Sequence, residues 1–197
     1  RIIFTSSMLV SKIGYQQKHF RDYLPPNNYG LSKAIGEEII WESKINASWC
    51  IIRPTSIWGP GFKIPYSKFF QLIFLGKYFH IGNQNVFKTY GYIGNTCYQI
   101  IKLLETRKEE FEKKVFYIGD SNNYNLRNWA DEIALISNSK LIKTLPKNLV
   151  FIAALLGSFL KILKIKFPMT LFRFKNMTSN NKIDLHNISK ICPQLPF

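Results

Sequence analysis

The sequence predicts an α/β fold built on a parallel β-sheet, and three features support this prediction. Residues 1–6 and 47–53 are short apolar runs rich in β-forming residues, as expected for strands buried on both faces of a sheet. Residues 29–44 lie between them and repeat their apolar positions at the period of a helix. Hydroxyl side chains lie at the carboxyl end of both runs, the edge where open α/β sheets bind ligands.

The segment after the first strand is predicted to be a loop followed by a helix. Residues 8–27 form the loop, whose Pro25-Pro26 pair blocks helix formation until Asn27 or Asn28 can cap the next element. The helix then spans residues 29–44. Its apolar positions are Leu31, Ala34, Ile35, Ile39 and Ile40, and Glu37, Glu38 and Glu42 are expected to face water.

Two residues at the start of this helix can carry acid–base chemistry. Lys33 follows Tyr29 by one turn on the same face, so its ammonium can lie near the phenol. A cation there favours the phenolate form, which makes Tyr29 a candidate general acid or base. Ser7, at the end of the first strand, could supply a hydroxyl that holds a substrate oxygen beside that phenol. The spacing alone is weak evidence, because Tyr and Lys often fall four residues apart by chance.

The middle of the chain predicts a series of shorter elements. Pro54 stops the second strand, and Gly59-Pro60-Gly61 turns the chain away from the sheet. The following elements are a helix over residues 65–76, short strands over 78–81 and 86–92 around a turn at Gly82-Asn83, a helix from Asn95 to about Arg107, a strand over 115–118 and a helix over 126–137.

Residues 148–163 are the most apolar stretch of the chain. With fewer than about 18 uncharged residues, the stretch is short for a membrane span. Lys161, Lys164 and Lys166 close it, which fits a basic helix lying on a membrane surface through residues 148–166. The alternative, which we favour, is a helix that packs its apolar face on the substrate-binding part of the protein or on a neighbouring subunit.

The chain carries a net charge of +15, from 27 Lys and Arg against 12 Asp and Glu. The charge is uneven, because the only acid beyond Glu132 is Asp184. Such a field attracts nucleotide diphosphates, nucleic acid or an anionic membrane. A lysine-rich composition with solvated side chains is the alternative explanation, because net charge speaks to association and not to fold.

A series of motifs connects these elements to a known family. Thr5-Ser6-Ser7 ends the first strand and Tyr29-Gly30-Leu31-Ser32-Lys33 opens the helix. Ile51 to Gly61, Ile81 to Gln84, Thr89 to Asn95 and Phe116 to Asp120 continue the series. In this order the motifs resemble those of the extended short-chain dehydrogenase/reductase family, and within it the NAD-dependent epimerases and dehydratases of nucleotide sugars. The resemblance covers residues 1–137 well and the tail more loosely.

The resemblance implies the C-terminal part of a Rossmann-like, doubly wound parallel sheet with a smaller α/β substrate-binding lobe. Residues 1–61 would belong to the dinucleotide-binding domain and residues 62–197 mainly to the lobe, with residues 94–120 returning to the sheet. The glycine-rich turn with which the family holds the cofactor pyrophosphate follows no strand here. We therefore expect an N-terminally truncated enzyme that is inactive alone and unstable, because strands that should pair with residues 1–6 are missing.

The resemblance also implies roles for individual residues. It assigns catalysis to Tyr29, Lys33 and Ser7, binding of NAD or NADP to Tyr29, Lys33, Thr55 and Ser6, and binding of the substrate to Ser7, Ser56 and Lys88. The family commonly has an Arg that contacts the nucleotide diphosphate where this chain has Lys88, which keeps the charge but loses the bidentate fork. No metal site is expected, because the His and Cys residues lack ligand spacing.

The leading functional prediction is an NAD(P)-dependent epimerase, dehydratase or reductase of a nucleotide sugar. A hydroxysteroid- or lipid-alcohol-type dehydrogenase of the same family is the second interpretation, motivated by the apolar stretch 148–163. A third is a non-catalytic relative that binds nucleotide or a membrane. Three widely spaced cysteines predict reduced thiols in a cytoplasmic protein, with peripheral membrane contact as an option. The expected partners are a small-molecule substrate and a second copy in a homodimer, and no nucleic acid.

Overall fold

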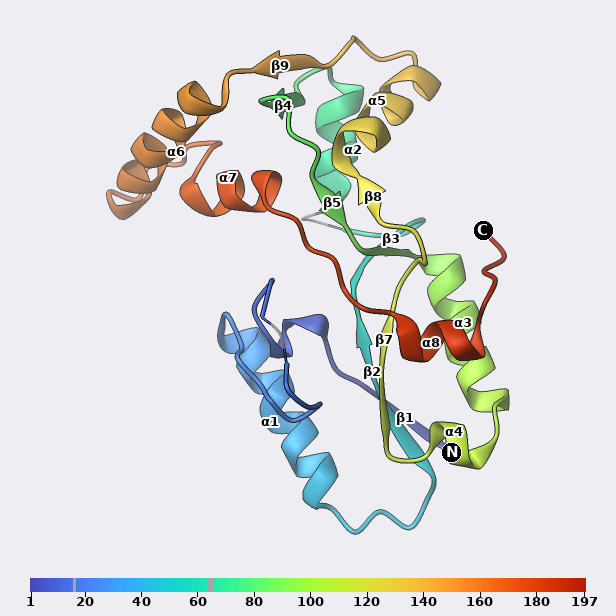
Figure 1. Cartoon of the computed structure of the whole chain (residues 1–197). Coiled ribbons are helices and arrows are strands. Elements are labelled where there is room, and N and C mark those ends of the chain that lie inside the picture. Colours follow the sequence, from blue (N-terminus) through green and yellow to red (C-terminus); the bar gives the residue numbers. More distant parts are fainter. Residues whose placement is uncertain (16, 64–65) are drawn as a thin grey trace. The chain divides into compact units, whose positions relative to one another are not determined.

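The computed structural model describes residues 1–15, 17–63 and 66–197, which divide into two compact units (Figure 1). Unit 1 consists of Arg1–Phe62, Thr89–Asn123 and Asn181–Phe197. Unit 2 consists of Lys63–Lys88 and Tyr124–Asn180. The chain therefore passes between the units four times.

Unit 1 is built on a parallel sheet with the strand order β1-β2-β7. The strands are β1 (Ile2–Thr5), β2 (Trp49–Pro54) and β7 (Lys114–Ile118). In this sheet β2 is the central strand and buries five of its six residues, as its continuous apolar run predicts. The predicted α/β fold with a parallel sheet is confirmed.

Helices cover both faces of this sheet, as expected for a doubly wound fold (Figure 1). Helix α1 (Asn28–Glu42) packs on one face, against Trp49, Ile51 and Val115. The other face is covered by α3 (Ile93–Glu105), α4 (Lys108–Phe111) and α8 (His186–Ile191), which pack on Cys50, Ile52, Phe116 and Ile118. Alternate residues of β2 and β7 thus enter opposite cores, because successive side chains of a strand point to opposite faces.

The predicted strand over residues 86–92 is interrupted at Thr89. Its first part, β5 (Phe87–Lys88), pairs antiparallel with β8 (Tyr124–Asn125) in unit 2. Its second part, β6 (Tyr90–Tyr92), pairs parallel with β3 (Ser56–Trp58) in unit 1. The two strands expected around Gly82-Asn83 do not pair with each other.

Unit 2 is held together by an aromatic and aliphatic core. Helices α2 (Tyr66–Phe74) and α5 (Leu126–Ile136) contribute Ile73, Ala130 and Ala134 to it. The rings of Phe69 and Trp129 lie 5.2 Å apart between centroids. A short parallel pair, β4 (Phe79–Ile81) with β9 (Lys143–Leu145), completes this part of the unit.

The apolar stretch of the sequence forms helix α6 (Lys147–Ile162), which packs on α7 (Leu171–Thr178). Gly157 allows the close approach between α6 and the segment before α7, because a Cβ there would lie 1.8 Å from the Met169 carbonyl oxygen. Within the described part of the chain, no helix combines the length and the apolar content needed to cross a membrane.

Candidate active site

The first turn of α1 brings Tyr29 and Lys33 to the carboxyl end of β1. Asn27 caps the helix by accepting a hydrogen bond from the Gly30 N–H at 2.9 Å, one of the two caps predicted. The Lys33 Nζ donates to the Thr5 carbonyl oxygen at 3.1 Å and lies 5.9 Å from the centroid of the Tyr29 ring. Tyr29 itself is more than half exposed, so its phenol is open to a ligand.

Ser7 lies in the same region, as the N-cap of the short 3-10 helix η1 (Met8–Val10). Its Oγ accepts a hydrogen bond from the Leu9 N–H at 3.2 Å, which leaves its own O–H able to donate. Gly30 of α1 approaches Leu9 so closely that a Cβ would lie 2.1 Å from the Leu9 carbonyl oxygen. The structure therefore brings Tyr29, Lys33 and Ser7 to one edge of the sheet.

Three buried hydroxyls have no hydrogen-bond partner within the described residues. Two of them follow strands at this edge, the Ser6 Oγ after β1 and the Thr55 Oγ1 after β2, and the third is the Thr96 Oγ1 of α3. The backbone N–H groups of the two strand-end residues are bound, Ser6 to Ile52 at 2.8 Å and Thr55 to Ile118 at 3.0 Å. A buried hydroxyl without a partner costs roughly 1–3 kcal/mol, so spare hydrogen-bonding capacity at the edge of a parallel sheet fits a polar ligand. Ser56, the first residue of β3, is also buried.

Lys88 belongs to unit 2, whereas the residues at the sheet edge belong to unit 1. It is 2% exposed, and its Nζ lies 3.5 Å from the Asn176 Oδ1. Burial lowers the pKa of Lys88 to about 8. A buried ammonium with one long contact to a neutral amide, among the residues described, favours an anionic ligand.

A buried ionic cluster under the sheet edge was not anticipated. Arg53 of β2 is fully buried and forms two hydrogen bonds with Glu37 of α1, at 2.9 and 2.7 Å. Its Nη1 also donates to the Tyr117 hydroxyl at 3.0 Å and to the Gln17 Oε1 at 3.1 Å. Glu37 was expected to face water, and this expectation is wrong, because an arginine in the central strand needs a buried counter-charge.

This cluster fixes α1 relative to the sheet. Tyr23 donates to the Glu37 Oε2 at 3.0 Å, and Tyr117 donates to the Gln17 Oε1 at 2.7 Å. Burial raises the pKa of both phenols above the ordinary value, so both remain donors at neutral pH. Glu37 follows Lys33 by one turn, so the cluster holds α1 where Lys33 reaches β1. The sequence signal was a charged residue inside the otherwise apolar run before Pro54.

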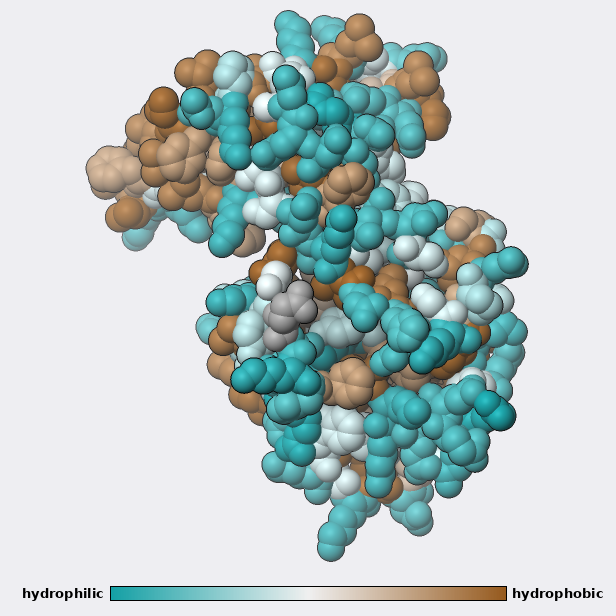
Figure 2. Space-filling view, in the orientation of Figure 1, coloured by the Kyte–Doolittle hydropathy of each residue, from teal (hydrophilic) through white to brown (hydrophobic). Residues whose placement is uncertain are grey.

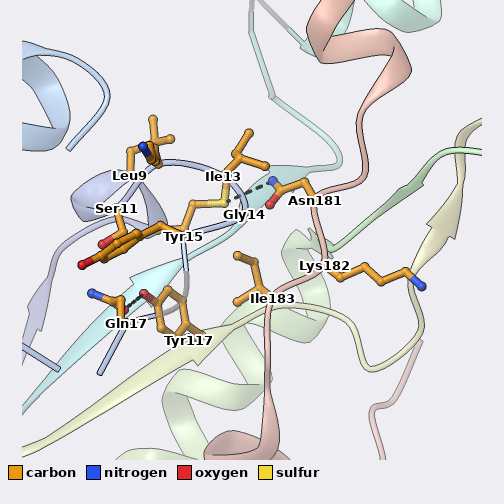
Figure 3. Close-up of a pocket in the computed structure, with 12 residues that line it drawn as sticks. Leu9, Ser11, Ile13, Gly14, Tyr15, Gln17, Tyr117, Asn181, Lys182 and Ile183 are labelled. Carbon is orange, nitrogen blue, oxygen red and sulfur yellow. Dashed lines mark hydrogen bonds between the residues drawn. The ribbon is translucent and has the colours of Figure 1, made fainter. Parts of the chain in front are cut away.

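A pocket of about 80 Å³ lies beside η1 in unit 1 (Figure 3). Its lining includes Met8, Leu9, Tyr15, Gln17, Tyr117 and Asn181. The Asn181 Nδ2 lies 4.0 Å from the Met8 sulfur, and its Oδ1 is buried without a partner in the part described. None of the predicted catalytic residues lines this pocket. Across the described residues, no cluster of three or more His, Cys, Asp or Glu could hold a metal ion.

A family model described as the 3-beta hydroxysteroid dehydrogenase/isomerase family matches residues 1–138, which include β1, α1, β2 and β7. The chain belongs to this family. It is a family of extended short-chain dehydrogenases/reductases, so the resemblance seen in the motifs is confirmed.

One curated relative is an epimerase. The chain is 27% identical over 207 residues to an N-acetyl-alpha-D-glucosaminyl-diphospho-ditrans,octacis-undecaprenol 4-epimerase from Escherichia coli O157:H7. The match covers 98% of this chain and 60% of that protein. The chain therefore spans about three fifths of the length of the curated relative.

Solved structures of epimerases share the fold. A UDP-glucuronic acid 4-epimerase from Bacillus cereus, in complex with UDP-glucuronic acid and NAD, is 16% identical and matches with a TM-score of 0.66 over 99% of this chain and 56% of that one. A UDP-N-acetylglucosamine 4-epimerase from Methanobrevibacter ruminantium M1, in complex with UDP-N-acetylmuramic acid, is 16% identical and gives a TM-score of 0.60 over 98% and 56%. The Rossmann-like architecture of the family member is thus confirmed.

Proposed function

We propose that the chain is the catalytic and substrate-binding part of an NAD(P)-dependent epimerase, dehydratase or reductase that acts on a nucleotide sugar. The observation that carries the proposal is the meeting of Tyr29, Lys33 and the Thr5–Ser7 strand end at one sheet edge. The names of the relatives support a sugar joined to a diphosphate as the substrate class.

In this proposal three side chains handle the reacting oxygen. Tyr29, open to solvent, exchanges a proton with a sugar hydroxyl or carbonyl. Ser7 donates its free O–H to the same oxygen, since its lone pair already accepts from Leu9. Lys33, held by the Thr5 carbonyl, keeps a positive charge beside the phenol and binds the cofactor ribose.

The residues of the sheet edge fit part of a dinucleotide site. The nicotinamide half of NAD or NADP would be held by Tyr29, Lys33, Ser6 and Thr55. The unpartnered hydroxyls of Ser6 and Thr55 would hydrogen-bond to it. The bound cofactor supplies or accepts the hydride. A glycine-rich turn for the pyrophosphate is not part of this sequence. We therefore propose that the 197 residues alone do not turn over, and that residues outside them complete the site.

Lys88 is proposed to bind the diphosphate of the substrate. Its burial and its single long hydrogen bond, within the described part, leave donors available to phosphate oxygens. Without an anion, the buried charge is costly. An anion of the substrate would offset that cost.

A lipid-linked alcohol is the second candidate for the substrate. The exposed apolar residues of α6 favour it, as does the polyprenol-linked substrate in the name of the curated relative. Turnover of a polyprenyl diphosphate sugar or of a hydroxysteroid, without turnover of nucleotide sugars, would favour this candidate. Absence of turnover with any of them would favour a non-catalytic relative.

A homodimer is proposed through the outer face of α1. Leu31, Ile35 and Ile39 are among the apolar positions that predict this helix, yet all three are exposed. Their spacing of four residues places them on one stripe, and the buried stripe is formed by Gly30, Ala34 and Glu37 instead. An apolar stripe of this kind fits a second copy of the chain.

The test is the substitution Tyr29→Phe in the protein extended to include its dinucleotide-binding segment. We expect kcat for UDP-sugar epimerisation or reduction to fall about 10²- to 10⁴-fold, because the proton donor is lost. The Kd for NAD or NADP, measured by calorimetry, should change little, because the ring stays in place.

The chain offers a matched control at Tyr98 of α3. Lys102 lies one turn after Tyr98, and its Nζ is 5.6 Å from the ring centroid, so the local pair repeats the geometry of Tyr29 and Lys33. Tyr98→Phe should leave kcat unchanged, because neither Tyr98 nor Lys102 is among the residues proposed to bind the cofactor or the substrate. Normal turnover of Tyr29→Phe would remove Tyr29 from the mechanism.

A further inference from the structure

Helix α6 exposes a continuous face of large apolar side chains (Figure 2). Ile152 is 61% exposed and Phe159 is 59% exposed. The same face carries Leu149, Leu155, Leu156, Ile162 and Leu163, all exposed. No charged residue interrupts it between Leu149 and Leu160. Exposed apolar patches of this extent mark surfaces that meet another apolar phase or partner.

The polarity of α6 is the reverse of that in an ordinary surface helix. The residues of α6 that are buried are Val150, Ala154 and Gly157, which face inward at helical spacing. The large residues point outward, where a globular protein normally places its polar side chains. The outer face therefore needs a cover, which α7 does not provide.

The charges around this face indicate what kind of surface binds it. From residue 137 to residue 180 every charged side chain is basic. Lys161, Lys164 and Lys166 are all exposed at the carboxyl end of α6. A second copy of the chain would bring like charges together, whereas an anionic lipid surface would attract each lysine by about 1 kcal/mol.

We propose that α6 lies in the headgroup region of an anionic membrane, with its outer apolar face buried among the acyl chains and Lys161, Lys164 and Lys166 on the lipid phosphates. The helix has 16 residues and is roughly 24 Å long, which is shorter than a bilayer core of about 30 Å. It therefore lies along the surface, as amphipathic basic helices do. This inference does not rest on the proposed reaction.

The experiment measures partition of the 197-residue chain, and of the extended protein, onto vesicles. Phosphatidylcholine vesicles are compared with vesicles that also contain phosphatidylglycerol, at low and at high salt, by flotation. We expect binding to the phosphatidylglycerol vesicles that weakens as salt rises, since surface charges are screened. Retained binding at high salt would report the apolar contribution.

Two variants separate the apolar and the electrostatic contributions. Ile152→Gln/Phe159→Gln should lose most of its partition onto both kinds of vesicle. Lys161→Gln/Lys164→Gln should lose about fivefold per lysine, and only on the anionic vesicles. All four side chains are exposed, so thermal unfolding followed by circular dichroism should be unchanged.

The matched control is Leu135→Gln/Ile136→Gln on α5. These two residues are 79% and 84% exposed in the same unit, and they belong to α5, whereas the lysine cluster lies at the end of α6. Their substitution should leave vesicle binding unchanged. Equal binding of wild type and Ile152→Gln/Phe159→Gln would overturn the proposal. The proposal would also be overturned if the protein did not bind vesicles and sedimentation showed that this variant only dissociates a dimer.

Discussion

At the scale of single residues, the candidate substrate-binding lysine is held in an unfavourable environment. Lys88 is buried in β5 and its pKa is lowered to about 8 from 10.5, because burial penalises the ammonium. Between these two pH values the unfolded chain binds more protons than the folded protein. The free energy of unfolding therefore rises as the pH increases from about 8 to 10.5.

Lys88→Met should stabilise the protein at neutral pH. The pKa difference of about 2.5 corresponds to about 3 kcal/mol. At pH 7 the free energy of unfolding of the variant should therefore exceed that of the wild type by up to about 3 kcal/mol. The gain should shrink towards pH 10, where the wild-type side chain is neutral as well. Urea unfolding at several pH values measures both the gain at pH 7 and its decrease towards pH 10.

Lys143→Met is the control for this substitution. Lys143 also lies in a strand, β9, but it is exposed. Its replacement should change the free energy of unfolding by less than about 0.5 kcal/mol at either pH. A Lys88→Met variant that is no more stable than wild type at pH 7 would contradict the buried-charge account, and with it the argument for an anionic ligand.

The sequence predicted the residues at the sheet edge through the order of motifs and not through local spacing. Tyr98 and Lys102 have the same spacing as Tyr29 and Lys33, and in each pair the Lys Nζ lies over the Tyr ring. Of the two pairs, only Tyr29 and Lys33 follow a strand that ends in serines. The Arg53–Glu37 pair was missed, because helical periodicity groups Glu37 with solvent-facing glutamates. Long-range pairing between a strand and a helix leaves no periodic trace.

At the scale of elements, α1 contains two glycines with opposite physical roles. Gly30 faces η1, and a Cβ there would meet the Leu9 carbonyl oxygen at 2.1 Å. Gly36 lies in the same helix, and a Cβ there would meet nothing within 4 Å. The first glycine is needed for close approach, whereas the second only lowers helix propensity.

Alanine substitutions at these glycines should change stability in opposite directions. Gly30→Ala should lower the free energy of unfolding by about 1–3 kcal/mol, since backbone must move to relieve the clash. Gly36→Ala should raise it by about 0.5–1 kcal/mol. Chemical denaturation of both variants measures the two signs. Equal stabilisation by both would mean that α1 does not pack on η1 as described.

The elements that could be predicted are those with a largely apolar run in the sequence, namely strands β2 and β7 and helix α6. Strand β1 was predicted from the same pattern as a buried strand, but none of its residues is buried, and α6 exposes most of its large side chains. Strand β9 could not be predicted, because Lys143, Thr144 and Leu145 are all exposed and only their backbone pairs with β4. The break between β5 and β6 was missed for a related reason. Strands of two or three residues are set by tertiary pairing and not by composition.

At the scale of the whole molecule, unit 1 is assembled from three separate segments of the chain. The last of them, residues 181–197, packs α8 on the sheet through Leu185, Ile188 and Cys192. The prediction from the sequence grouped these residues with the smaller lobe, since a short helix with few apolar residues carries no sign of the surface on which it packs. Segment assignment depends on contacts between residues far apart in sequence.

The return of the tail to unit 1 predicts a localised response to a core substitution. Ile188 is 1% exposed, so Ile188→Ala should cost about 2–5 kcal/mol. The amides of β7 should then exchange hydrogen faster, while those of α5 in unit 2 keep their wild-type rates. Ile162→Ala, at a residue 78% exposed, is the control and should change neither. If Ile188→Ala instead accelerated exchange in α5 and spared β7, the tail would pack on unit 2, and the sheet would lose one of the helices that cover its second face.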